Sequence, residues 1–268
     1  MEAVPVSSIV GPHGAPQAIT VQPGAFPARA DIWMPLPVPV EGVPSGLEYL
    51  TMVDKIIIQQ IHEVVEVITG FETRNKYALR NANGEQVYYA FEESECCERL
   101  CCGPGRGFTM HVVDNFGREV LRIQRPFRCC GRGCYGLLAG VPGCGSECTI
   151  ESPPGYVIGT VEQRATFCAS SFVVKDNKDE VILRIDGPCC CLLCGCQDKE
   201  FPVTLPSDEH IGFITKKWGG VLREMFTDAD IFGVTFPINL DVRAKAALLG
   251  ATFLIDFMEF EQNRRRNV

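Results

Sequence analysis

The sequence lacks the features that would place it in several common classes of protein. Its 268 residues carry a net charge of −8, so a protein whose main role is nucleic-acid binding is not expected. The N-terminus has no basic segment followed by a long apolar run, and the chain has no N-x-[ST] glycosylation acceptor. A secreted protein is therefore not indicated, and we expect the chain on the cytosolic side of the membrane.

The usual signals for catalysis are also missing. The four histidines form no H-x₃-H pair, and no Ser/His/Asp or Cys/His arrangement has a spacing that supports an activated nucleophile. The glycines of Gly103-x-Gly105-x-Gly107 are not followed by the GK[ST] of a phosphate-binding loop. We therefore do not expect an enzyme that works by covalent or acid–base catalysis.

No apolar run has the length of an ordinary membrane span. The most apolar stretch is Ala246–Phe257, and its uncharged part has ten residues, from Ala246 to Ile255, before Asp256. A bilayer core needs about 20 apolar residues, so the length favours a helix buried on all sides by protein over a membrane-spanning helix. A helix that is apolar all round must be surrounded by the rest of the chain.

The chain is rich in short β-type segments separated by turn signals. Asn83-Gly84 separates two such runs as the turn of a β-hairpin, and further hairpins are predicted around Asp114-Asn115 and Asp176-Asn177. The second and third hairpins match each other at an offset of 62 residues, which indicates an internal duplication. The predicted strands are Lys55–Ile61, Glu63–Thr69, Tyr77–Arg80, Gln86–Phe91, Phe108–Val113, Glu119–Ile123, Tyr156–Val161, Phe172–Lys175, Val181–Ile185, His210–Thr215, Val221–Met225 and Gly233–Phe236.

About a dozen short strands predict a β-sandwich or a closed barrel. A barrel of that size has room for more than its own side chains, so a barrel closed around the C-terminal helix satisfies both patterns. We therefore expect a mainly β, pseudo-duplicated barrel over residues 46–261, with its helix over 243–260. Residues 1–45 hold nine of the 18 prolines and are expected to form a disordered tail, and residues 262–268 a basic tail.

Fifteen cysteines are many for a chain without a secretion signal, and most fall in clusters at 96–102, 129–134 and 189–196. Three interpretations are open, namely zinc ligands, acylated thiols, or reduced side chains packed as small apolar groups. Cys191 and Cys194 have the spacing of a zinc knuckle, and Cys130 and Cys134 lie across the repeat from them, so these four are the zinc candidates. Alternatively, two or more acyl chains would anchor the protein stably to a membrane.

The segment that begins at Asp228 resembles a calcium-binding loop. Asp228, Asp230 and Gly233 occupy positions 1, 3 and 6 of an EF-hand loop, whereas position 12 is Asn239 instead of a bidentate Glu. With Asp241 close behind, the candidate calcium ligands are Asp228, Asp230, Asn239 and Asp241, and we expect weak binding. The alternative is an acidic turn that leads into a strand.

A small basic-aromatic patch is formed in sequence by Lys216, Lys217 and Trp218. Such a patch suits contact with phosphate groups or a role in nuclear import. The alternative is a pair of solvated lysines.

Several segments together resemble the phospholipid scramblase family. They occur in family order from about residue 46 to residue 261, which is more specific than any single motif above. The segments are Gly46-Leu47-Glu48-Tyr49-Leu50, Thr69-Gly70-Phe71-Glu72-Thr73-x-Asn75-Lys76-Tyr77, Cys101-Cys102-Gly103-Pro104, Asp114-Asn115-x-Gly117-Arg118-Glu119-Val120, Arg125-Pro126-x-Arg128-Cys129, Leu222-Arg223-Glu224-x-Phe226-Thr227-Asp228-Ala229-Asp230 and Phe253-Leu254-Ile255-Asp256-Phe257-Met258.

The resemblance implies a tubby-like fold, a twelve-stranded barrel around a C-terminal helix. It also implies calcium-stimulated, ATP-independent, bidirectional movement of phospholipids between membrane leaflets. The family's calcium segment corresponds to Asp228–Asn239, where Ile231 and Asn239 replace more acidic or oxygen-bearing residues.

The resemblance also points to modification and targeting sites. The family's palmitoylated cluster corresponds to the segment with Cys129, Cys130 and Cys134, which residues 131–133 interrupt in this chain. The family's nuclear import segment corresponds to residues 212–220, where Phe213 replaces a basic residue.

Two functional hypotheses follow. The first is a scramblase-type membrane protein that binds Ca²⁺, and the second is a palmitoylated, membrane-tethered module that binds lipid headgroups or proteins without moving lipid. The expected partners are membrane phospholipids, proteins that bind the proline-rich tail, and further copies of the chain. The expected location is the cytoplasmic face of the cell membrane, with the nucleus as a weaker alternative.

Overall fold

The computed structural model describes residues 32–61, 74–102, 105–127, 139–141, 143–166, 169–189, 199–217 and 231–260. The elements in chain order are η1 (Glu48–Met52), β1 (Lys55–Ile61), β2 (Lys76–Arg80), β3 (Gln86–Glu93), α2 (Cys96–Cys102), β4 (Phe108–Val113), β5 (Glu119–Arg125), β6 (Glu147–Glu151), β7 (Val157–Arg164), β8 (Ala169–Asp176), β9 (Val181–Cys189), β10 (Lys199–Thr204), β11 (His210–Lys217), β12 (Ile231–Thr235), α3 (Val242–Ile255) and the π-helical turn η4 (Asp256–Phe260).

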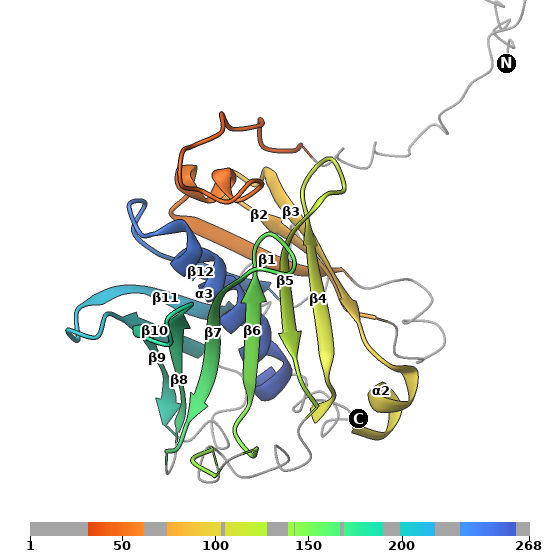
Figure 1. The fold of residues 1–268 in the computed structure, drawn as a ribbon, viewed down its shortest axis with the longest axis vertical. Coiled ribbons are helices and arrows are strands. Elements are labelled where there is room, and N and C mark those ends of the chain that lie inside the picture. The colour runs from red at the N-terminus through yellow and green to blue at the C-terminus, as the bar shows by residue number, and fades with distance from the viewer. Residues whose placement is uncertain are drawn as a thin grey trace, which may run out of the picture. The chain divides into compact units, whose positions relative to one another are not determined.

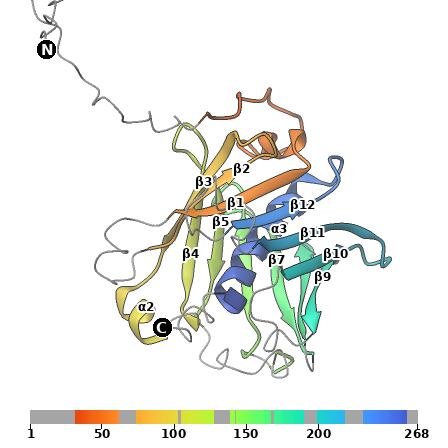
Figure 2. The same ribbon diagram turned by 180° about the vertical axis from the view of Figure 1, so that it is seen from behind.

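Twelve antiparallel strands form a closed barrel (Figures 1 and 2). Each strand pairs with the next one along the chain, and β12 pairs with β1 to complete the ring. Closure leaves no sheet edge with a row of unpaired backbone groups. The predicted mainly β barrel of about twelve strands is confirmed.

Helix α3 runs through the barrel and is surrounded by strands in both ribbon views (Figures 1 and 2). Every residue of α3 except Arg243 is buried, so the helix has no polar face. In the barrel wall around the helix, buried and less buried side chains alternate along the strands. In β4, for example, Phe108, Met110 and Val112 are buried and the residues between them are not. The expectation of a helix buried on all sides by protein is confirmed, and the membrane-spanning alternative does not describe this structure.

The hairpin turns reproduce the duplication that the sequence predicts. In the β4–β5 turn, Asp114 Oδ1 accepts the backbone N–H groups two and four residues later, at 2.9 and 3.0 Å. In the β8–β9 turn, 62 residues further on, Asp176 Oδ1 accepts the equivalent N–H groups at 2.8 and 3.0 Å. Asn81 does the same in the β2–β3 turn, so one side-chain-to-backbone pattern initiates all three turns.

The up-and-down strand order places successive connections at opposite ends of the barrel. The turn end carries the short turns that follow β2, β4, β6, β8 and β10, and α3 begins there. The cysteine end carries the other connections and the C-terminus of α3. All 15 cysteines fall, in sequence, in the connections of the cysteine end or among the strand residues next to them, and none falls in the turns of the turn end.

Three described elements do not follow from the sequence patterns. Strand β10 contains Pro202, which argues against a strand by pattern alone. Strand β6 is short and acidic at both ends, and α2 is built mostly from cysteines, which have low helix propensity. The predicted strands Glu63–Thr69 and Val221–Met225 lie outside the described residues.

The domain begins earlier than residue 46. Trp33 forms a parallel bridge with Gln86 at the start of β3, and the Met34 N–H donates to the Gln86 carbonyl at 2.8 Å. The Met34 side chain is buried in the barrel core. Residues 32–45, assigned to the tail by their prolines, therefore belong with the barrel.

Candidate functional site

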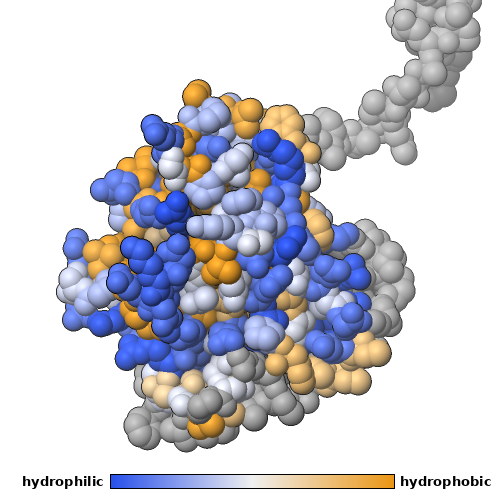
Figure 3. Space-filling view, in the orientation of Figure 1, coloured by the Kyte–Doolittle hydropathy of each residue, from blue (hydrophilic) through white to orange (hydrophobic). Residues whose placement is uncertain are grey.

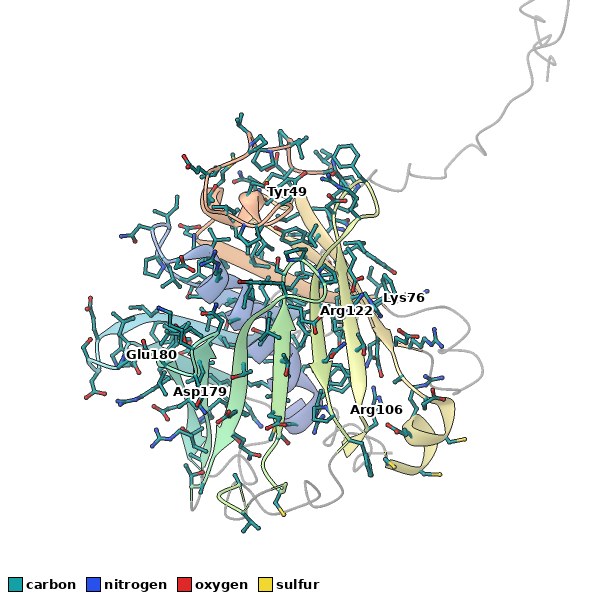
Figure 4. All side chains as sticks on the ribbon, in the orientation of Figure 1. Tyr49, Lys76, Arg106, Arg122, Asp179 and Glu180 are labelled. Carbon is teal, nitrogen blue, oxygen red and sulfur yellow. The ribbon has the colours of Figure 1, made fainter. Side chains whose placement is uncertain are left out.

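The short helix α2 presents two thiols to solvent at the cysteine end. Cys97 and Cys101 are exposed, and Cys102 is half-buried. Residues four apart lie on the same face of a helix, so the two exposed thiols are neighbours. Figure 4 shows yellow sulfur atoms projecting outward from α2, and Figure 3 shows pale orange, apolar side chains over the same corner.

Hydrogen bonds from two adjacent residues hold α2 against the neighbouring strands. Glu98 Oε2 accepts the N–H of Gly107, just before β4, at 3.0 Å. Arg99 Nη1 donates to the carbonyl and the hydroxyl oxygen of Ser94, just after β3, at 2.5 and 3.0 Å. These bonds use the polar residues in the middle of α2, and Cys97 and Cys101 on either side of them are exposed.

A groove of about 800 Å³ is lined by residues of α2 and of strands β3 to β6. Its charged lining is mixed, with four glutamates and three arginines, and Phe127, 46% exposed, is also a lining residue. Such a lining suits polar or charged groups and does not suit the acyl chain of a lipid. Its charged residues are Arg74, Glu93, Glu95, Glu98, Arg99, Arg125 and Glu147.

A buried ion pair lies inside the barrel at the cysteine end. Arg106 Nε and Nη2 donate to the two carboxylate oxygens of Glu92 at 2.7 and 3.0 Å, and both side chains are almost fully buried. Burial alone would raise the pKa of Glu92, but the hydrogen bonds and charge of Arg106 outweigh it and hold that pKa below its usual value. The guanidinium also lies 4.6 Å from the centre of the Phe257 ring, which ties the pair to the end of the central helix.

Asp256, the residue that interrupts the apolar run, lies in the same layer. The Tyr77 hydroxyl donates to Asp256 Oδ2 at 2.8 Å, and both side chains are buried. The hydrogen bond from the barrel wall satisfies this carboxylate inside the protein. The same group would cost much free energy in the hydrocarbon of a bilayer. The polar end of α3 is therefore adapted to the barrel interior.

The structure describes two of the four predicted calcium residues. Asp228 and Asp230 lie outside the described residues, immediately before β12 in the chain. Asn239 and Asp241 lie after β12, at the turn end, and Asp241 caps α3 by accepting the N–H groups of Arg243 and Ala244 at 2.8 and 3.4 Å. Residues 231–235, the middle of the predicted loop, form strand β12, which is paired on both sides.

Lys216, the first residue of the predicted basic patch, is not exposed to solvent. This side chain is buried on β11, and its Nζ lies 5.1 Å from the centre of the Phe232 ring. Lys217 is the last residue of β11, and Trp218 lies outside the described residues. Lys216 is therefore part of the barrel interior.

The predicted palmitoylation and zinc residues lie outside the described residues. These are Cys129, Cys130 and Cys134 for acylation, and Cys130, Cys134, Cys191 and Cys194 for zinc. Within the described ranges, no group of three or more His, Cys, Asp or Glu side chains is placed to hold a metal ion. Across those same ranges, no helix has both the length and the apolar character that a membrane crossing requires.

Arg106 and Lys245 are among the buried charges that the sequence patterns do not indicate. Arg106 follows Gly105 in what reads as a glycine-rich turn, and its pairing with Glu92 has no local sequence signal. Lys245 lies next to the apolar run, and its Nζ donates to the carbonyls of Leu50, Val53 and Ile238. The position of Lys245 beside ten uncharged residues was the sequence signal that could have indicated its burial.

A closed barrel filled by its own C-terminal helix defines the class of this protein. A family model described as Scramblase matches residues 34–262, which is nearly all of the barrel domain. The chain belongs to the Scramblase family.

Named relatives agree with that assignment. The chain is 46% identical to phospholipid scramblase 2 of Bos taurus over 258 residues, covering 95% of this chain and 85% of that protein. It is 47% identical to human phospholipid scramblase 1, covering 85% of this chain and 70% of that protein. It is 40% identical to human phospholipid scramblase family member 5, covering 93% of this chain and 92% of that protein. No solved structure matches the chain.

Proposed function

We propose that this chain acts on membrane phospholipids and mediates their bidirectional, ATP-independent movement between leaflets, stimulated by calcium. The observation that carries the proposal is the family match over residues 34–262, together with relatives named phospholipid scramblases. The proposed activity is translocation of lipid and involves no covalent catalysis.

The buried helix sets a condition on the mechanism. Because α3 occupies the barrel interior, lipid headgroups have no passage through a single closed barrel. Release of α3 into the bilayer would carry Lys245 and Asp256 into hydrocarbon, which is costly for both charges. We therefore propose that lipid moves along the outside of assembled chains, where polar protein surface lowers the barrier for the headgroup.

Calcium binding and membrane attachment are assigned to separate segments of the chain. We propose Asp228 and Asp230 as the calcium ligands, because they are two residues apart in the sequence, at positions 1 and 3 of the loop pattern. We propose that acylation of Cys129, Cys130 and Cys134 holds the chain at the cytoplasmic face of the cell membrane. Zinc at Cys130, Cys134, Cys191 and Cys194 stays a prediction that metal analysis of the purified protein tests.

A second candidate function is favoured by the same buried helix. A barrel without an internal passage suits a membrane-tethered module that binds headgroups or proteins through its outer surface. The polar groove beside α2 is the concave feature that such a module would use.

Reconstitution separates the two functions. The purified full chain is inserted into phosphatidylcholine and phosphatidylserine vesicles with a fluorescent lipid, and a membrane-impermeant reductant quenches the outer leaflet. We expect quenching to pass beyond the outer-leaflet share when Ca²⁺ is added. Quenching that stops at the level of protein-free vesicles, while the chain still sediments with them, contradicts lipid movement and favours the tethered module.

A further inference from the structure

The groove beside α2 has a regular polar floor, built by residues that pair across neighbouring strands. Glu93 on β3 pairs with Thr109 on β4. Thr109 in turn pairs with Gln124 on β5, and Gln124 pairs with Thr149 on β6. All four residues line the groove, and buried residues alternate with them along each strand, so their side chains lie on the outer face of the barrel.

Arg74 continues this row on the β2 side of Glu93. The Glu92 N–H donates to the Asn75 carbonyl at 2.8 Å, so the β2–β3 register extends by one residue and places Arg74 opposite Glu93. Arg74 is exposed, whereas the other two arginines of the lining are buried and donate to serine oxygens. Arg74 is therefore the cation that this groove presents to solvent.

A carboxylate and an aromatic ring flank Gly107 at the α2 side of the groove. Glu98 Oε2 accepts the Gly107 N–H at 3.0 Å, which fixes the carboxylate on the wall that α2 forms between β3 and β4 (Figure 1). A Cβ atom added at Gly107 would lie 3.0 Å from the Phe127 backbone nitrogen, so Phe127 adjoins the same glycine. A carboxylate next to an aromatic side chain that is 46% exposed attracts an ammonium group through charge and through the face of the ring.

The two ends of the groove are complementary to opposite charges. Arg74 and Gly107 are separated by two strand spacings, about 10 Å, and the long arginine side chain shortens this gap. Between them the floor presents the hydroxyl of Thr109 and the amide of Gln124, which hydrogen-bond to ester or hydroxyl oxygens. The three arginines and four glutamates of the lining sum to −1, so a ligand with net negative charge is disfavoured.

We propose that this groove binds the zwitterionic headgroup of a phospholipid, with the phosphate at Arg74 and the ammonium group between Glu98 and the Phe127 ring. The inference rests on the proposed function and deepens it by naming the headgroup class, phosphocholine and phosphoethanolamine in preference to anionic phosphoserine. The acyl chains stay outside the groove because its lining is polar. Headgroup recognition at this site serves both lipid movement and a tethered binding module.

The first test measures binding of water-soluble headgroups to the purified full chain by titration calorimetry. The ligands are glycerophosphocholine, glycerophosphoethanolamine and glycerophosphoserine, with choline and inorganic phosphate as the two halves of the zwitterion. We expect the first two to bind, and glycerophosphoserine and each half to bind roughly tenfold more weakly, because each loses a charge partner or adds a repulsion. Glycerophosphoserine that binds as tightly as glycerophosphocholine overturns the proposal.

Three substitutions locate the binding in the groove. R74A removes the cation, F127A removes the ring, and E98Q removes the negative charge while it keeps an oxygen that accepts the Gly107 N–H. We expect each to weaken glycerophosphocholine binding roughly fivefold. Substitutions that leave the affinity unchanged overturn the groove as the site.

The control F116A removes an aromatic ring that is 60% exposed in the β4–β5 turn, at the other end of the barrel. It should bind glycerophosphocholine as the unsubstituted chain does. Because Arg74 and Phe127 are exposed, R74A and F127A should also keep the urea midpoint of the unsubstituted chain. These two variants therefore keep the test decisive if E98Q lowers stability.

Phosphatidylcholine vesicles distinguish a lipid headgroup from a free phosphodiester. We expect excess glycerophosphocholine to reduce the amount of chain that sediments with the vesicles, and F127A to sediment less than F116A. Sedimentation that neither the competitor nor F127A changes overturns the lipid headgroup as the occupant, even if the soluble compound binds.

Failure of the proposed function gives a different result. If the groove binds glycerophosphocholine but the reconstituted chain does not accelerate lipid exchange, the headgroup site stands and the lipid-moving activity does not. If calcium stimulates lipid exchange equally in R74A, F127A and the unsubstituted chain, the activity stands and the groove is overturned as its headgroup site.

Discussion

The thiol of Cys148 on β6 lies against the backbone carbonyl of Gly250 on α3, with 3.8 Å between the sulfur and the oxygen. Both residues are fully buried, and burial raises the pKa of the Cys148 thiol to about 12. Relative to an ordinary cysteine, such a thiol has on the order of 10³-fold less reactive thiolate. Cys148 is therefore a native reporter of whether the helix fills the barrel.

The first prediction concerns labelling of that reporter. We expect a maleimide reagent to modify Cys97 and Cys101 readily while Cys148 stays unmodified, both in solution and after binding to vesicles. Time-resolved labelling followed by peptide mass spectrometry measures all three positions in one sample. The ratio of Cys148 to Cys97 labelling corrects for reagent and pH.

Calcium provides the decisive condition for this experiment. If vesicles and Ca²⁺ raise the labelling rate of Cys148 toward that of Cys97, α3 leaves the barrel during function. Helix release would then replace the assembly of closed barrels as the route for lipid. Continued protection during active scrambling supports the assembly route.

The second prediction concerns the close contact at Gly250. A Cβ atom added there would lie 2.7 Å from Ile150 Cγ1, so G250A overpacks the helix–wall contact. We expect it to lower the free energy of unfolding by about 1–3 kcal/mol, although Ala is otherwise favoured over Gly in a helix by about 1 kcal/mol. Urea denaturation measures the change.

Its control is a double-mutant cycle with I150A, which removes the atoms that the new Cβ would meet. G250A should cost less in the I150A background than in the unsubstituted chain, because the clash is then absent. Stabilisation by G250A alone would show that the wall yields at this point.

The architecture was predictable from sequence because its signals are local and repeated. Hairpin turns such as Asn83-Gly84 can be recognised because few residues adopt the backbone geometry that they need. The 62-residue offset indicates that the turns at Asp114 and Asp176 are equivalent. The helix was placed by length, since ten uncharged residues are too few for a bilayer and a barrel of twelve strands has room for them. Strand β10 was not predicted because Pro202 argues against a strand. In the structure, pairing with β11 forms the strand nevertheless.

The site was less predictable because its contacts join residues far apart in sequence. Arg106 and Glu92 are 14 residues apart, and Tyr77 and Asp256 are 179 apart. The EF-hand pattern at Asp228 depends on spacing alone, and spacing does not reveal that β12 runs through the middle of the segment. The periodicity of a sequence predicts which faces of the strands are buried and where the turns lie. Predicting which buried polar side chains pair requires the strand register of the closed barrel.

The third prediction concerns Lys245, which fastens the N-terminal turn η1 to the central helix. Its Nζ donates to the carbonyls of Leu50, Val53 and Ile238 at 2.8, 3.1 and 2.7 Å. K245M leaves these carbonyls without that donor, and we expect a loss of roughly 3 kcal/mol in the free energy of unfolding. Denaturant titration at neutral pH measures it.

The pH dependence of the same residue gives an independent check. Burial lowers the pKa of Lys245 to about 8, partly opposed by the charge of Asp54, against 10.5 for an ordinary lysine. Between these values the unfolded chain binds more protons, so this residue makes stability rise with pH from about 8 to about 10.5. The unsubstituted chain should gain stability relative to K245M over that window, and parallel pH profiles would contradict the pKa assignment.

The fourth prediction compares a buried and an exposed ion pair. R106A leaves the Glu92 carboxylate buried without its partner, and we expect a loss of about 3–5 kcal/mol in unfolding free energy. The control R184A removes a pair whose Asp208 partner is 84% exposed, and should cost less than about 1 kcal/mol. Since the pKa of Glu92 is lowered, the stability it contributes is present at neutral pH and is lost as the pH falls through and below the usual glutamate range. Equal losses for the two variants would contradict the buried pair's role.

The fifth prediction separates calcium binding from helix capping. Strand β12 is five residues long, so about 15 Å of chain separates Asp228 and Asp230 from Asn239 and Asp241. Calcium ligands lie about 2.3–2.6 Å from the ion, so we expect that one ion does not bind both groups. We expect D228N/D230N to abolish calcium binding in titration calorimetry, while N239A leaves it unchanged.

Asp241 should show the opposite behaviour to the two upstream aspartates. D241A removes the acceptor for the N–H groups of Arg243 and Ala244, and should lower the unfolding free energy by about 1 kcal/mol without altering the calcium isotherm. D228N/D230N should leave stability without calcium unchanged, since neither residue caps α3. If N239A or D241A weakens calcium binding as much as D228N/D230N, all four residues share one ion. The β12 ladder would then have to open when calcium binds.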